Sequence, residues 1–86
     1  MKTFPLIIST PDGEIFNDSA VNISVRGVEG ELAVMAGHIP FVTAVKPGRC
    51  TVELEDGSIK EAAIEGGILT VSSDNVRVLA GSFTWK

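Results

Sequence analysis

The sequence predicts an all-β domain, a flattened antiparallel sandwich or barrel of about 8–10 short strands. Short runs of alternating apolar and polar residues recur along the chain, which is the pattern of half-buried strands. Glycine, proline, aspartate and asparagine separate these runs about every 6–12 residues, as turns require. Apolar residues nowhere recur at helical spacing over a long window, so no helix is expected. The 86 residues have room for a single domain, 1–86.

The N-terminal third contains three predicted stretches of extended chain. Alternation over 3–9 predicts a strand, and Pro5 favours a place at a sheet edge, because proline cannot donate to a ladder. The Thr-Pro-Asp-Gly sequence at 10–13 predicts a turn, after which 15–16 resume extended structure. A second alternating run over 20–26 predicts a strand with one face in water.

The middle of the chain gathers glycine, proline and the most apolar run. Residues 27–30 predict a hairpin, and 31–35 predict the return strand before a loop at 36–38. The run 39–45 is apolar at consecutive positions, so it is either sandwiched inside the fold or exposed for a partner. Lys-Pro-Gly at 46–48 then predicts a turn.

The C-terminal half reads as a series of short strands and turns. Alternation over 49–55 places Cys50 on the apolar side, where a free cysteine is expected to be buried. Asp56-Gly57 between two strand-like runs predicts a two-residue type I′ hairpin. The later elements follow in order: a strand over 59–64, a turn at 66–67, a strand over 68–72, a turn at 73–75 and a strand over 76–80.

Composition excludes several classes of function. Seven basic against eleven acidic residues give a net charge of −4, and the scattered cations disfavour nucleic-acid binding. One cysteine cannot form an intramolecular disulfide, which favours a reducing compartment. No apolar run approaches the ~20 residues that span a bilayer, so any membrane association is expected to come through a partner, without direct insertion.

Catalytic chemistry finds little support in the residues. His38 with one of several serines and acids could form a hydrolase site, but there is no nucleophile-elbow pattern, and such a site would need a pocket that joins these groups. One histidine and one cysteine fall short of a structural zinc site. The glycine-rich turns are not followed by a phosphate-binding helix start. We therefore predict no catalytic, cofactor-binding or metal-binding residues.

Four ordered blocks resemble the epsilon subunit of bacterial F-type ATP synthase. The first is Gly-x-Glu-Gly-Glu-Leu at 27–32, and the second is Gly-His-x-Pro at 37–40, followed by Thr-Ala and Lys-Pro-Gly. The other two are Gly-Gly-Ile-Leu-Thr-Val at 66–71 and Asn-Val-Arg-Val-Leu-Ala at 75–80. The resemblance covers about residues 3–82, nearly the whole chain.

The resemblance implies a non-catalytic rotor subunit at the foot of the central stalk. In that family the N-terminal β-sandwich packs against the gamma subunit and rests on the polar loops of the c-ring, at the cytoplasmic face of the bacterial membrane, in one copy per complex. It implies that Glu31 faces the c-ring loops and that His38 and Thr43 lie near gamma. Phe41, in the apolar run, is expected to face gamma as well. No cofactor is implied.

The chain departs from the family pattern in two places. Ala36 stands where many members have proline, and the sequence ends at Lys86, whereas many epsilon subunits continue into a regulatory helical hairpin. Trp85 is therefore expected either to cap the sandwich or to begin a link to further structure. The alternative function is a free-standing β-sandwich adaptor in another complex, and failure to bind a gamma subunit would favour it.

Overall fold

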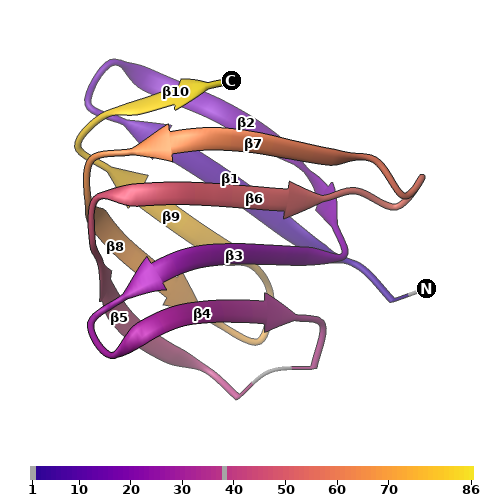
Figure 1. Ribbon diagram of the computed structural model, residues 1–86. Helices are drawn as coiled ribbons and strands as arrows, with labels where there is room; N and C mark the ends of the chain where they lie inside the picture. Colours follow the sequence, from indigo (N-terminus) through magenta and orange to yellow (C-terminus); the bar gives the residue numbers. More distant parts are fainter. Residues whose placement is uncertain (1, 38) are drawn as a thin grey trace.

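The structure, a computed structural model that describes residues 2–37 and 39–86, consists of strands joined by short turns (Figure 1). The predicted all-β class is confirmed, and the described residues contain no helix. The strands are β1 (Phe4–Thr10), β2 (Gly13–Ala20), β3 (Asn22–Gly27), β4 (Gly30–Met35), β5 (Phe41–Val45), β6 (Gly48–Glu53), β7 (Ile59–Ile64), β8 (Gly67–Val71), β9 (Val76–Ala80) and β10 (Phe83–Trp85).

The strands pack as two layers that form one nearly closed sheet. Strands pair in the order β10-β7-β6-β3-β5-β8-β9-β1-β2, and β4 pairs with β3 outside this path. Figure 1 shows β3, β4, β6 and β7 in one layer and β1, β2, β5, β8 and β9 in the other. A single pair, Gly27 with Val45, joins the layers between β3 and β5.

At the opposite seam, aromatic packing joins the two ends of the sheet. The rings of Phe16 on β2 and Trp85 on β10 lie 5.9 Å apart, and Phe83 lies 4.9 Å from Trp85, both edge-to-face. Trp85 also pairs with Ala62 of β7, and the Lys60 ammonium lies 5.0 Å from the centre of its ring. Of the two roles expected for Trp85, the structure therefore shows the cap on the sandwich.

One pair of neighbours departs from the predicted antiparallel arrangement. β1 and β9 run parallel. The strands β2 to β8 separate them along the chain, and only a short hairpin between two strands requires antiparallel pairing. β1 lies between β2 and β9, so the edge position suggested by Pro5 was wrong. Proline is tolerated there because it is the second residue of β1 and precedes the β9 ladder, which begins at Leu6.

The core fills the space between the layers with side chains from alternate strand positions. Cys50 is fully buried, as its phase predicted, and so are side chains from both layers. Among the largest fully buried residues are Leu6, Ile8, Ile23, Val25, Val34, Val52, Ile64, Leu69 and Val78.

The β6–β7 hairpin forms where Asp56-Gly57 predicted it, but with another turn. No described residue other than glycine has positive φ, so Asp56 cannot occupy a type I′ turn. The Gly57 N–H donates to the Leu54 carbonyl, and the Leu54 N–H donates to the Ser58 carbonyl. This is a type I turn followed by a glycine with φ of 91°. The loop is therefore longer than the two-residue type I′ hairpin loop that the sequence predicted.

The Asp56 carboxylate stabilises this loop, which gives a pH-dependent prediction. It accepts bonds from the Ser58 hydroxyl at 2.6 Å and the Ser58 N–H at 2.9 Å. These bonds, the hydroxyl first, lower the pKa of Asp56 below its ordinary value of 3.8. A lowered folded-state pKa stabilises the fold above the unfolded-state pKa, and this contribution is lost as pH falls through the folded value. Asp56→Ala is expected to lower the melting temperature at pH 7, and the difference should vanish in strong acid. An equal difference at both pH values would contradict the assignment.

Candidate functional site

The outer surface of the β5-β8-β9 sheet carries several exposed apolar side chains. Val42, Ile68 and Leu79 are exposed by 67%, 48% and 57%. The strand register places Ala44 opposite Ile68, and Ile68 opposite Leu79. Val42 lies two residues before Ala44 on β5, on the same side of the strand. We call these four residues, Val42, Ala44, Ile68 and Leu79, the apolar face. Contiguous exposed apolar surface on a soluble domain commonly marks a contact with a partner.

The structure separates the two sides of the apolar run that sequence alone left ambiguous. Along β5, Val45 is buried, Phe41 and Thr43 are half-buried, and Val42 and Ala44 are exposed. Phe41 packs against the core cluster, so the residue expected to face gamma points into the sandwich. The outward positions of the run, Val42 among them, are the ones that a partner can reach. The run therefore has one face in the sandwich and one face in water, and its contact with a partner stays a prediction.

Glu31 and Thr43, which were expected to meet different partners, lie at the same end of the molecule. Both line a hollow of about 170 Å³ at the β3–β4 turn, which Leu32 lines as well. Glu31 is exposed and opposes Arg26 in the β3–β4 ladder. The Thr43 hydroxyl donates a long hydrogen bond of 3.4 Å to the Ala44 carbonyl. His38, the third residue carried over from the resemblance, lies outside the described residues.

The outer surface of the β3-β6-β7 sheet is polar, in contrast to the apolar face. It carries Arg26, Arg49 and Glu61, and the Arg49 guanidinium lies 3.3 Å from the Glu61 carboxylate. Both partners of this ion pair are well exposed, with side chains 63% and 44% accessible, so the pair adds little stability. The β5-β8-β9 surface is thus mainly apolar, whereas the β3-β6-β7 surface carries an ion pair.

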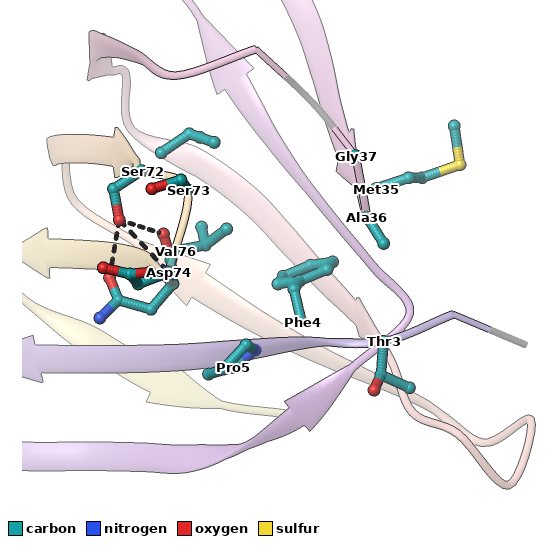
Figure 2. A pocket seen from close by; sticks show the side chains of 12 residues that line it. Thr3, Phe4, Pro5, Met35, Ala36, Gly37, Ser72, Ser73, Asp74 and Val76 are labelled. Atoms are coloured by element: carbon teal, nitrogen blue, oxygen red, sulfur yellow. Dashed lines mark hydrogen bonds between the residues drawn. The ribbon is translucent and has the colours of Figure 1, made fainter.

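A hollow lined in part by Gly37 contains a serine hydroxyl, which bears on the hydrolase alternative. Thr3, Phe4 and Met35 line it together with a turn that contains Ser72 (Figure 2). The Ser72 hydroxyl donates to the Asn75 carbonyl at 3.0 Å and accepts from the Asn75 N–H at 3.2 Å. Its hydrogen bonds close the β8–β9 turn, and no described base activates it.

The single cysteine lies in the core. Burial raises the pKa of the Cys50 thiol to about 11, so it stays protonated and inert at neutral pH. Across residues 2–37 and 39–86, no group of three or more metal-binding side chains comes together. The same residues include no helix long and apolar enough to cross a membrane.

Comparison with known proteins decides the family. Residues 3–86 match the beta-sandwich domain of the ATP synthase delta/epsilon chain. The chain belongs to this delta/epsilon family. The predicted resemblance is thereby confirmed, and the family is that of a non-catalytic subunit.

Two solved structures share the fold of this delta/epsilon domain. A chain in the Euglena gracilis mitochondrial ATP synthase, solved with OSCP, F1 and c-ring, matches with TM-score 0.91 and 28% identity over 96% of this domain. A chain in the central stalk and c-ring of the Tetrahymena thermophila mitochondrial ATP synthase shares the fold, with TM-score 0.78 and 18% identity over 95% of the domain. The domain spans 53% and 66% of the length of those two chains.

The sequence of the delta/epsilon domain left open an exposed side of the run 39–45, but it did not predict that Ile68 and Leu79 would join Val42 in one apolar face. Leu79 stood in the outward phase of its strand beside Arg77, where a polar residue is usual. Ile68 and Val42 lay within continuous apolar runs, which do not reveal the face that is wet. The grouping of the three depended on strand neighbours that are far apart in sequence.

Proposed function

We propose that this chain is a non-catalytic central-stalk subunit of an F-type ATP synthase that links the gamma subunit to the c-ring. The observation that carries the proposal is the apolar face on a domain of the delta/epsilon family. The apolar face binds gamma, and the β3–β4 end with Glu31 meets the polar c-ring loops. A rigid sandwich with two such surfaces transmits torque between its partners without chemistry of its own.

The size of a stable contact supports a role for the whole β5-β8-β9 surface. A standard interface buries about 800 Å² on each partner, which is about a sixth of this domain's 5078 Å². An interface of this size extends beyond the four residues of the apolar face. The apolar face then forms the centre of the contact, and neighbouring side chains such as Thr70 and Arg77 form its rim. One copy per complex follows from a single stalk on a single ring. The domain then lies at the membrane surface through its partners, on the cytoplasmic side in a bacterium.

Glu31 supplies the test of the ring contact. A carboxylate that meets a basic loop forms a charge-assisted contact, and reversal to lysine replaces attraction by repulsion. We expect Glu31→Lys to weaken binding of the gamma-bound domain to the c-ring by about 10-fold or more, while gamma binding is retained. Glu14→Lys, at an exposed position on β2, is the matched control. Equal ring binding by both variants would remove Glu31 from the contact.

Co-purification tests the assignment as a whole. The domain should form a stoichiometric complex with the gamma subunit encoded in the same genome, observed by size-exclusion chromatography. A folded domain that does not bind gamma would favour the alternative, an adaptor that uses the same sandwich in another complex.

A further inference from the structure

The chain contains two Asp-Gly sequences, and each stands in an exposed turn. Asp12-Gly13 lies at the β1–β2 turn and Asp56-Gly57 at the β6–β7 turn, and all of these residues are exposed. Aspartate before glycine is prone to isomerise, because glycine has no side chain that shields its amide nitrogen from the neighbouring carboxyl group. Sequence and exposure therefore do not distinguish the two sites.

Hydrogen bonds close the Asp56 site. The Asp56 carboxylate accepts from the Ser58 hydroxyl at 2.6 Å and from the Ser58 N–H at 2.9 Å. The Gly57 nitrogen, which would be the nucleophile, donates its N–H to the Leu54 carbonyl at 3.0 Å. Both reacting groups are thus engaged. The Ser58 bonds also lower the pKa of Asp56, which leaves less of the protonated carboxyl group that a nucleophile attacks.

The Asp12 site lacks this protection. Within residues 2–37 and 39–86, the Asp12 carboxylate accepts no hydrogen bond and joins no ion pair. The Asp12 N–H donates to the Thr10 hydroxyl at 3.3 Å, which leaves the carboxylate in water. Gly13 pairs with Thr10 at the last position of the β1–β2 ladder, and the end of a ladder opens more readily than its middle.

We propose that Asp12 is a site of isoaspartate formation in the folded domain and that Asp56 is protected from it. The Gly13 nitrogen attacks the Asp12 carboxyl carbon and loses its proton, and the carboxyl hydroxyl departs with a proton as water, which leaves a cyclic succinimide. Water then adds to the main-chain carbonyl of the succinimide, and the ring opens. The chain afterwards runs through the Asp12 side-chain carbons, and the former main-chain carbonyl becomes a carboxylate. The water lost in the first step is regained in the second, and nothing is oxidised or reduced.

The product changes the β1–β2 turn locally. Its main chain is longer between residues 12 and 13, so the adjoining Thr10–Gly13 pair should be lost. Ile8, which is fully buried and pairs with Phe16 farther along the ladder, should keep its place. The reaction needs no partner, so the inference is independent of the proposed stalk function.

Ageing of the folded domain at neutral pH tests the inference. Isoaspartate is measured in the peptides that contain Asp12 and Asp56, by transfer of a labelled methyl group from S-adenosylmethionine with a protein isoaspartyl methyltransferase. We expect the product to form at least about 10-fold faster at Asp12 than at Asp56. In the chain unfolded by guanidinium, both sites should react at similar rates, because the bonds around Asp56 are absent. Equal rates in the folded domain, or a faster reaction at Asp56, would overturn the inference.

Two variants separate the causes. Ser58→Ala removes the hydroxyl that binds the Asp56 carboxylate, and it should raise the rate at Asp56 in the folded domain. Asp12→Glu keeps the charge at an exposed position, but its longer side chain does not form the succinimide, so the signal should disappear from that peptide. An unchanged rate at Asp56 in the first variant, or a persistent signal in the second, would contradict the inference.

Discussion

Ile68→Asp is expected to abolish stable assembly with the gamma subunit while the domain stays folded. Ile68 lies at the centre of the apolar face, between Ala44 on β5 and Leu79 on β9. A carboxylate there must lose its water when a partner covers it, and a central hot-spot residue is typically worth 2–4 kcal/mol. We therefore expect a loss of about 100-fold or more in gamma affinity, measured by titration of the purified subunits. Ile68 is 48% exposed in the free domain, so the variant should melt at nearly the same temperature as the original domain.

Two comparison variants separate loss of docking from loss of folding. Ile59→Asp changes an isoleucine that is 65% exposed on β7, in the other layer, and should bind gamma normally. Phe41→Asp places a charge against the core cluster and should unfold the domain. Loss of assembly by this variant would then follow from unfolding and would not require Phe41 to contact gamma. Assembly by Ile68→Asp at the original affinity would exclude the apolar face as the gamma contact.

Gly67→Ala is expected to destabilise the domain more than any other glycine substitution. Gly67 begins β8 and opposes Ala80 of β9. A Cβ at this position would collide with the Leu79 carbonyl oxygen and lie 2.9 Å from the Ala80 Cα, and both atoms belong to backbone that cannot rotate away. Overpacking typically costs 1–3 kcal/mol, and a backbone clash belongs at or above the upper end. Thermal unfolding should therefore begin more than about 10 °C lower.

Gly81 is the matched control for this substitution. An added Cβ there meets only the Gly66 carbonyl oxygen at 3.8 Å, an ordinary contact. Gly81→Ala should therefore shift stability by less than about 0.5 kcal/mol. If both variants melted together, β8 and β9 would not approach each other as closely as the structure has them.

Local sequence patterns were sufficient for most of the fold. Period-2 alternation located β3 and β9, and turn residues located the connections between strands, because both are properties of neighbouring residues. The phase of Cys50 predicted its burial for the same reason. The type of the Asp56 turn was beyond such rules, since loop length depends on which strand residues pair across the hairpin.

Less of the candidate site than of the fold could be predicted from the sequence. Glu31 and Thr43 came from the resemblance, and the structure places both at the β3–β4 end. The roles of these residues, and of His38 and Phe41, stay predictions. The inward position of Phe41 could not be read from its run, because a strand with apolar residues on both sides has no phase that identifies its wet face.

The sequence by itself determined an all-β chain of the delta/epsilon family, with its strand periodicity and most of its turns. Only the tertiary structure decided that β1 and β9 are parallel neighbours and that Phe16 and Trp85 close the seam. It also decided that β5, β8 and β9 bring their outward residues into one apolar face. The reason is that alternation assigns a residue to one side of its own strand, whereas a surface is built from strands that are distant in sequence.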